Sequence, residues 1–354
     1  MSKHDLLIIG SNNKSTGGIP RYIPEQLEHL PNSVDSSVFD VGAPEGAGIV
    51  WFLKSFVLSV FDAFRFPFRP RPEVVHVHSS QQFSFYRASF YVLFTTYIWR
   101  RPVILHIHGS SFDEFVTTDS VISRFIQSIV YAAATRIIVL SEYWKEQLGP
   151  YTDPEKITII PNAVDPDDYA PEYDHETRHV IFLSNLIERK GVNEFVTAVE
   201  NILETQSNLQ ISIAGKGPLS KRVEKLESKS NSVAYLGYVT EAEKYDLLSK
   251  GSIYVLPAYA EGLPIAILES MAGGNAVVST TVGSVPEIID DENGRLVSPR
   301  DAEELANVLE DLILSPDTVE EMGRNNRRLV EERYCWDKVA GQLVNQYETV
   351  TQER

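Results

Sequence analysis

Cysteine is almost absent from this 354-residue chain, and Cys335 is its only one. A lone cysteine excludes an internal disulfide and a metal site built from several thiolates. A membrane-spanning helix needs roughly 20 apolar residues, and Lys54 and Asp62 interrupt the apolar run that begins at Ile49. The first residues pass directly from a polar start into a strand-like run, which is not the pattern of a secretory signal. Together these absences predict a cytoplasmic location.

Positive charge is also scarce, with 32 Lys and Arg against 49 Asp and Glu and a net charge of -17. A strongly acidic protein is not expected to have nucleic acid as its main partner. Residues 51–71, WFLKSFVLSVFDAFRFPFRPR, are an exception because they combine basic and aromatic side chains. Such a segment is typical of a helix lying at a membrane surface. The alternative is an amphipathic helix packed on its own sheet, with arginines that snorkel to water.

Short apolar runs alternate with helical patterns along the chain, which predicts an α/β protein with parallel sheets. The expected strands are DLLIIG, EVVHVH, PVILHIH, TRIIVLS, HVIFLSNL, LQISIAG, SVAYLGYV, SIYVLPA and NAVVST. A polar stretch rich in Pro and Asp, residues 161–178, is the predicted linker. We therefore expect two doubly wound domains, over residues 1–165 and 166–337, that face each other across a cleft. Ligands of such sheets bind at the carboxyl ends of the strands.

Residues 257–274, PAYAEGLPIAILESMAGG, predict a buried apolar helix that starts near Gly262 and ends at the glycine pair. Glu261 stands at its mouth and Glu269 eight residues later, so their carboxylates lie about 12 Å apart along the helix axis. They could contact two ends of one extended ligand. Alternatively, Glu261 favours the helix dipole and Glu269 is a structural hydrogen-bonding group. A buried Glu269 needs donors, either ligand hydroxyls or a basic side chain.

Other short motifs, each weak alone, occur in a fixed order along the chain. They are GG at 17–18, HG at 108–109, LSE at 140–142, PNAVD at 161–165, KG at 190–191, AGKGP at 214–218, LGYV at 236–239 and GSVPEII at 283–289. Together with the glutamate pair they resemble the signature of family-4 retaining glycosyltransferases. That resemblance covers nearly the whole chain. It implies the GT-B fold, two Rossmann-like domains, with the last helix, residues 338–354, crossing back to the first domain.

The resemblance also implies roles for several residues. Lys190 binds the diphosphate of a nucleotide-sugar donor, Glu269 the ribose hydroxyls, and Glu261 the sugar and its positively charged anomeric carbon. Backbone amides near Gly262 and Leu263 lie against the diphosphate and sugar. His108 orients the sugar from the other domain. Further donor-binding positions are Gly17, Gly18, Gly215, Tyr238, Val239 and Asn185.

Asn185 departs from the family pattern, which usually has an arginine there, and asparagine lacks the guanidinium fork. Arg189 is a candidate substitute at a different position. The implied activity is retaining, hexosyl-type transfer from a nucleotide-diphosphate sugar to a lipid-linked or glycan acceptor, in cell-surface polysaccharide or glycolipid biosynthesis. A lipid-linked acceptor favours a peripheral location on the inner face of the plasma membrane, with residues 51–71 as the contact. A non-catalytic GT-B subunit and a sugar-nucleotide epimerase are the alternatives.

No metal and no cofactor are expected for this transfer. His106 shares a strand with His108, and His76 and His78 lie on a strand expected to be its neighbour. These histidines either bind a metal ion or are buried and hydrogen-bonded, and we predict the second. A nicotinamide enzyme is disfavoured because Ser220 replaces the third glycine of a dinucleotide fingerprint.

Overall fold

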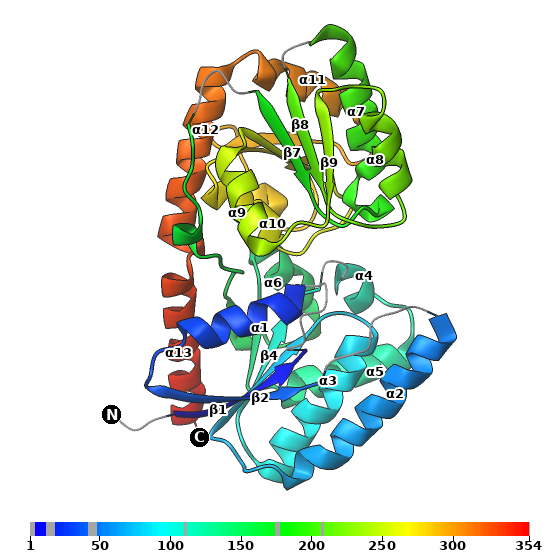
Figure 1. Cartoon of the computed structure of the whole chain (residues 1–354). Coiled ribbons are helices and arrows are strands. Elements are labelled where there is room, and N and C mark those ends of the chain that lie inside the picture. The colour runs from blue at the N-terminus through cyan, green and yellow to red at the C-terminus, as the bar shows by residue number, and fades with distance from the viewer. Residues whose placement is uncertain are drawn as a thin grey trace. The chain divides into compact units, whose positions relative to one another are not determined.

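A computed structural model of the chain describes residues 4–11, 18–41, 48–109, 112–173, 178–206 and 209–353. The chain divides into two compact units, Met1–Asn162 with Trp336–Arg354 (unit 1) and Ala163–Cys335 (unit 2). Each unit contains one six-stranded parallel sheet with helices around it (Figure 1). The predicted α/β fold class is confirmed.

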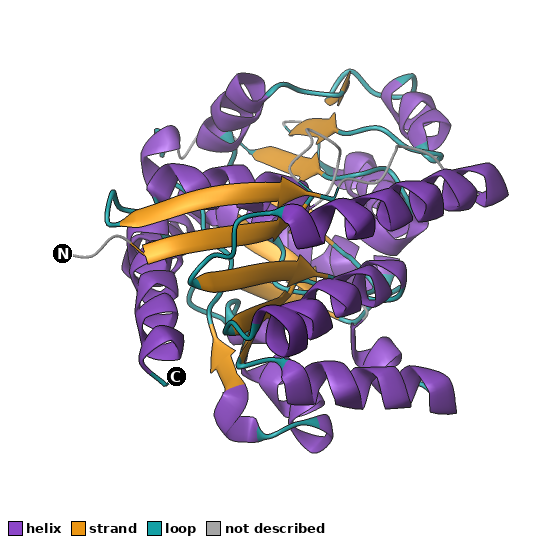
Figure 2. Ribbon diagram, turned by 90° about the horizontal axis from the view of Figure 1, so that it is seen from below, coloured by secondary structure: helices purple, strands orange, loops and turns teal. Residues whose placement is uncertain are grey.

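Unit 1 is built on a sheet with the strand order β2-β1-β3-β4-β5-β6, and Figure 2 shows these strands side by side with helices packed on them. The strands are β1 (His4–Gly10), β2 (Val34–Asp40), β3 (Val74–Ser79), β4 (Val103–Ile107), β5 (Arg136–Val139) and β6 (Ile157–Ile159). The helices are α1 (Gly18–His29), α2 (Gly48–Arg65), α3 (Phe83–Phe94), α4 (Phe112–Val116), α5 (Val121–Ala133), α6 (Glu142–Leu148) and α13 (Trp336–Gln352). The last helix, α13, contacts α1 and β3, so the end of the chain completes the first unit.

Unit 2 has the strand order β12-β11-β10-β7-β8-β9. Its strands are β7 (His179–Leu183), β8 (Gln210–Ala214), β9 (Val233–Gly237), β10 (Ile253–Leu256), β11 (Ala276–Thr280) and β12 (Gly294–Val297). Its helices are α7 (Val192–Thr205), α8 (Ser220–Glu227), α9 (Glu241–Lys250), α10 (Ile265–Ala272), α11 (Ala302–Ile313) and α12 (Pro316–Leu329). The β-branched strands and α7 and α11 share one apolar core. As predicted, the Asp301 carboxylate caps α11 by accepting the Glu304 amide.

Helix α1 begins at Gly18 and carries Pro24 in its interior. Two sequence-based boundaries need correction. The helix expected to begin near Gly262 begins at Ile265, with Pro264 as its N-cap residue, because the preceding GLP segment remains a loop. The final helix, expected over residues 338–354, spans Trp336–Gln352.

No helix in the described parts of the chain combines the length and the apolarity that a membrane crossing requires.

Candidate active site

The order of strands in unit 2 places a binding crevice between β7 and β10. The chain runs from β7 outward to β8 and β9, then returns to β10 on the other side of β7 and continues to β11 and β12. This is the doubly wound order, in which ligands bind beyond the carboxyl ends of the two strands where the direction reverses. The loops that leave β7 and β10 therefore form the candidate site.

These two loops bring Lys190 and Glu261 into an ion pair, in which the Lys190 Nζ donates to Glu261 Oε1. The side chains are only 15% and 6% exposed, so the pair is largely shielded from water. Lys190 closes a short 3-10 turn, Glu188–Lys190, that follows β7, and Glu261 follows β10. Residues 71 apart in the sequence, both predicted for the same site, thus meet at the crevice.

Arg189 and Gly191 hold the same two loops together. The Arg189 guanidinium donates to the Ala260 carbonyl at 2.6 Å, and the Tyr259 amide donates to the Arg189 carbonyl at 2.8 Å. Gly191 has a positive φ of 71°, and a Cβ there would lie 1.9 Å from the Pro257 carbonyl oxygen. Arg189 is the residue that the sequence suggested as a substitute for the missing arginine. In the structure its guanidinium binds the backbone carbonyl of Ala260, next to Glu261.

Glu269 lies inside the unit, 1% exposed, on α10. Its Oε1 accepts a hydrogen bond from the Lys244 Nζ of α9 at 2.6 Å, and the Tyr169 hydroxyl lies 3.4 Å from the same oxygen. The Lys244 ammonium also bonds the exposed Glu241 carboxylate. The sequence left open whether Glu269 accepts hydrogen bonds from ligand hydroxyls or from a basic side chain. In the structure the basic side chain of Lys244 is a donor. Lys244 itself was not predicted.

The hydroxyl of Tyr254 on β10 donates to the Leu183 carbonyl at 2.9 Å, close to both glutamates. Its pKa is raised well above the usual value, first by burial and then by the negative charges of Glu269 and Glu261.

Two glycines shape the loops at this edge of the sheet. Gly215 has a φ of 138°, and a Cβ there would lie 1.8 Å from the Ser184 carbonyl oxygen, so the loops after β8 and β7 are in contact. Gly283 has a φ of 53°, and its Cβ would lie 1.9 Å from the Glu261 carbonyl oxygen. Gly262 and Leu263 are buried beside it, and the Gly262 carbonyl accepts the Ser284 amide at 3.2 Å. The Glu261 loop is thus fixed by backbone on both sides.

The remaining predicted donor-binding residues of unit 2 lie at the exposed rim. Asn185 is exposed after β7, and Val239 is partly buried after β9. Tyr238 is 63% exposed, and the Lys216 ammonium lies 5.5 Å from its ring centroid. The contact of these residues with a nucleotide stays a prediction.

In unit 1, His108 follows β4, and its Nε2 lies 2.9 Å from Nδ1 of His78 on the adjacent strand. Burial lowers the pKa of His108 to about 3, while a hydrogen bond with Asn162 acts in the opposite direction. His108 is therefore a neutral imidazole held by two neighbours. Its predicted role toward the sugar stays a prediction. Gly18 begins α1, and Gly17 lies outside the described residues.

Below this pair lies a second one, in which His76 Nε2 is 3.2 Å from His106 Nδ1. His76 Nδ1 is also 2.8 Å from the Tyr347 hydroxyl, which accepts a hydrogen bond from Gln26 at 2.8 Å. Burial lowers the pKa of His76 to about 3. Tyr347 of α13 could not be linked to this cluster from the sequence, because the two lie 271 residues apart.

Helix α2 carries an exposed apolar surface. Its exposed apolar side chains are Ile49, Phe52, Leu53, Phe56, Val57, Leu58, Val60, Phe61 and Phe64. Lys54 and Arg65 are exposed on the same helix. Trp51 and Phe52 contact Phe83 of α3, with ring centroids 6.3 and 5.9 Å apart. A helix packed on its own sheet would bury its apolar side chains, whereas these side chains of α2 are exposed.

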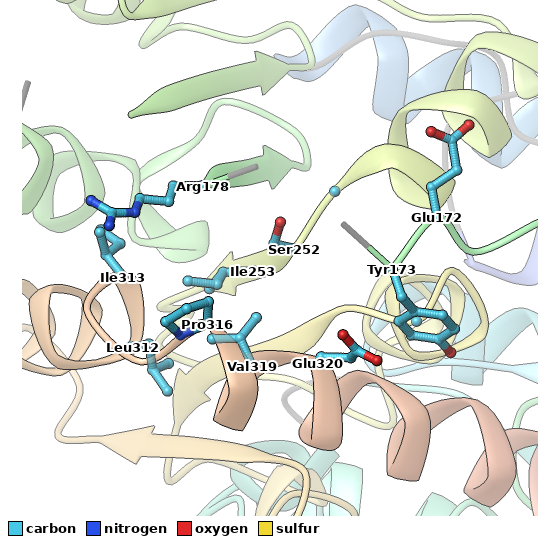
Figure 3. Close-up of a pocket in the computed structure, with 12 residues that line it drawn as sticks. Glu172, Tyr173, Arg178, Ser252, Ile253, Leu312, Ile313, Pro316, Val319 and Glu320 are labelled. Atoms are coloured by element: carbon cyan, nitrogen blue, oxygen red, sulfur yellow. The ribbon is translucent and has the colours of Figure 1, made fainter. Parts of the chain in front are cut away.

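One pocket of unit 2 lies beside the amino ends of β7 and β10 (Figure 3). Its lining includes Arg178 and Ser252, which precede β7 and β10, together with Pro316 and Val319 of α12. None of the predicted site residues lines it. The pocket therefore does not coincide with the candidate active site.

The two doubly wound units and the charged switch point define a Rossmann-type protein of the GT-B class. Residues 16–168 match the family described as Glycosyltransferase Family 4, and residues 167–329 match Glycosyl transferases group 1. The chain belongs to the family-4 GT-B glycosyltransferases, as the sequence motifs indicated.

Several characterised proteins resemble the chain. It is 28% identical to MMP alpha-(1->4)-mannosyltransferase of Mycolicibacterium hassiacum, over 71% of this chain and 59% of that one. It is 30% identical to phosphatidyl-myo-inositol mannosyltransferase of Mycolicibacterium smegmatis, over 71% of this chain and 66% of that one. The crystal structure of Anabaena HepE with UDP-glucose superposes with a TM-score of 0.74 at 16% identity, covering 98% and 100% of the two chains. The chain spans about six-tenths of the first of these relatives.

Proposed function

We propose that this protein transfers a sugar from a nucleotide-diphosphate donor to a lipid-linked or glycan acceptor, with retention of anomeric configuration. The observation that carries the proposal is the shielded Lys190–Glu261 pair at the switch point of unit 2. A lysine and a carboxylate there supply a cation for a diphosphate and an acceptor for sugar hydroxyls. The relatives named as mannosyltransferases and the UDP-glucose complex of HepE support this class of donor and acceptor.

In this proposal Lys190 exchanges Glu261 for the donor diphosphate. A lysine about 4 Å from a phosphate charge contributes about 4 kcal/mol at an effective dielectric constant of 20, before desolvation. Glu261 then accepts hydrogen bonds from sugar hydroxyls and stabilises positive charge at the anomeric carbon. The loop at Gly262 and Leu263, fixed by Gly283, presents backbone toward the diphosphate.

No residue acts as a covalent nucleophile in the proposed reaction. The bond between the anomeric carbon and the donor phosphate oxygen breaks, and the acceptor oxygen bonds to the same face of that carbon. The acceptor's proton passes to a donor phosphate oxygen. The protein contributes orientation and electrostatic stabilisation of the leaving diphosphate, and the scheme uses no metal ion.

Glu269 is proposed to accept hydrogen bonds from the donor ribose. Its buried carboxylate already accepts a hydrogen bond from the Lys244 ammonium, so Lys244 holds the Glu269 side chain in place inside the unit. The ribose then meets an oriented carboxylate.

The test is nucleotide release from a panel of UDP-, GDP- and ADP-sugars, with a membrane extract as the acceptor source. We expect Glu261→Gln and Lys190→Met each to lower turnover about a hundredfold or more, because each removes a charge used in the transition state. Lys250→Met is the matched control, since Lys250 pairs with Asp246 on the exposed surface. NMR of the product linkage reports retention, and unchanged turnover in the first two variants contradicts the proposal.

Helix α2 is proposed to hold the protein at the inner face of the plasma membrane. Its exposed phenylalanines would enter the acyl boundary, and Lys54 and Arg65 would meet anionic lipid, at about 1 kcal/mol per basic residue near the surface. In flotation with phosphatidylglycerol vesicles, the triple variant Phe56→Ser, Phe61→Ser, Phe64→Ser should lose most binding. Leu314→Ser removes an exposed apolar residue of unit 2 and should bind as wild type does. Equal flotation of both variants would rule out α2 as the anchor.

The exposed Asn185 favours a second candidate, a non-catalytic subunit that binds a partner glycosyltransferase. The release assay separates the two functions, because such a subunit leaves every donor intact. Asn185→Arg distinguishes them further, since added turnover indicates a working site that lacks only the guanidinium.

A further inference from the structure

Three buried histidines in unit 1 form a group that the proposed transfer does not use. His76 and His78 lie two residues apart on β3, so their side chains point to the same face of the sheet. His106 of β4 is paired with His78 and points to that face as well. Their exposed fractions are 0%, 4% and 0%. Within the described residues, this is the one group of three side chains with metal-ligating atoms that all lie within 4.8 Å of one another.

Two ring nitrogens of this group are buried without a partner in the part of the chain that the structure describes, His78 Nε2 and His106 Nε2. From the sequence we predicted hydrogen-bonded histidines, and the observed bonds leave these two atoms out. A buried polar atom without a partner destabilises the folded state, and such atoms call for a water or an ion.

We propose that His76, His78 and His106 bind a divalent transition-metal ion, with zinc as the reference ion. Zinc binds imidazole nitrogens at about 2.0–2.1 Å in tetrahedral geometry, which sets the nitrogens about 3.3 Å apart. His76 Nε2 and His106 Nδ1 are 3.2 Å apart. The same geometry separates ring centroids by about 5 Å, and the three centroid distances are 4.2, 5.3 and 5.1 Å.

The neighbours of the group provide the outer contacts that metal-bound histidines require. A ligating histidine is oriented by a hydrogen bond at its other ring nitrogen. His76 Nδ1 contacts the Tyr347 hydroxyl at 2.8 Å, and His78 Nδ1 contacts His108 Nε2 at 2.9 Å. These bonds leave Nε2 of His76 and of His78 for the metal, and His106 would bind through Nδ1, which lies 3.2 Å from His76 Nε2.

Tyr22 of α1 offers a fourth ligand. Its ring lies against His78 and His106, with centroids 5.5 and 5.3 Å apart, and its buried hydroxyl has no partner among the described residues. A phenol bound to zinc loses its proton to solvent, which reduces the net charge of the site from +2 to +1.

The experiment measures metal content of untagged protein after incubation with zinc and gel filtration. We expect about one equivalent per chain in wild type and less than about a tenth in His106→Gln and His78→Asn. His179→Asn is the matched control, because His179 is equally buried in unit 2 but bonds Ser212 and the Lys250 carbonyl. It should retain the full equivalent. Wild type without zinc, or loss of zinc in none of the variants, overturns the proposal.

A second measurement uses only the wild-type protein, so it stays informative even where the histidine variants do not fold. Cobalt-substituted wild type should show the visible d–d bands of a four- or five-coordinate imidazole site. Zinc should also raise the melting temperature of chelator-treated protein. Octahedral cobalt bands alone, with no thermal shift, would leave the histidines as hydrogen-bonded pairs with water and refute the site.

Discussion

At the scale of single residues, the most informative contact is the one between Lys244 and Glu269. Both are almost fully enclosed, and removing one partner of a buried pair leaves an uncompensated charge. The pair joins α9 to α10, and Glu269 is the residue proposed to bind the donor ribose.

We predict that Lys244→Met destabilises the protein by about 3–5 kcal/mol, because the Glu269 carboxylate stays buried without its cation. The double variant Lys244→Met, Glu269→Met should recover most of that loss, since apolar replacement of a buried pair is often neutral. Urea unfolding followed by tryptophan fluorescence measures both. Lys250→Met, at an exposed pair, should leave the urea midpoint unchanged. A midpoint equal to wild type for Lys244→Met would show that the pair is not formed.

Sequence reasoning located one partner of this pair and missed the other for a physical reason. Glu269 is conspicuous because it interrupts an apolar helix. Lys244 lies in the polar sequence TEAEK, whose Thr240 and Glu243 form a capping box typical of an exposed helix start. Only the packing of α9 against α10 buries its ammonium, and one sequence carries no signal of that packing.

At the scale of elements, continuous apolar runs made nine of the strands predictable, whereas β2, β6 and β12 were not predicted, and β2 shows the reason most clearly. Residues of β2 alternate between exposed and partly buried, with Asp35, Ser36 and Ser37 in its centre. It lies at the edge of its sheet, where one side needs no apolar cover. Its sequence therefore resembles a polar loop. The loops beyond β7, β8 and β10 were singled out as site elements because their glycines and charged residues are unusual after buried strands, and their role in binding stays a prediction.

The contact between the loops after β7 and β8 depends on Gly215. We predict that Gly215→Ala destabilises unit 2 by about 2–4 kcal/mol, because the added Cβ would overlap the Ser184 carbonyl and the backbone has a positive φ. Gly237→Ala is the control, since its φ is also positive, at 64°, but the space around it is open. It should cost only about 1 kcal/mol. Equal urea midpoints for the two variants would show that the overlap is relieved at no cost.

At the scale of the whole molecule, the order of the chain makes the two units unequal. Unit 2 is one continuous stretch, Ala163–Cys335, with its own sheet and core. Unit 1 is discontinuous and includes α13, whose Trp336, Leu343 and Tyr347 are buried. Unit 2 therefore has what an independent domain needs, whereas unit 1 requires the end of the chain.

We predict that residues 163–335 expressed alone fold and bind a nucleoside diphosphate, because Lys190, Glu261 and Glu269 all lie within them. Cooperative thermal unfolding by circular dichroism tests folding. By contrast, residues 1–335 should show a destabilised unit 1, since Tyr22, His76 and Gln26 lose their contacts with α13. An unfolded 163–335 fragment would contradict the division into units.

The most direct test of the central claim is calorimetric titration of UDP, GDP and ADP into the full chain and its Lys190→Met and Lys250→Met variants. We predict one site per chain for at least one of these nucleotides. We also predict a loss of about tenfold to a hundredfold in affinity for Lys190→Met, from the missing charge-assisted bond, with Lys250→Met unchanged. Binding by Lys190→Met as tight as by wild type would contradict the claim that the crevice between β7 and β10 holds the donor diphosphate.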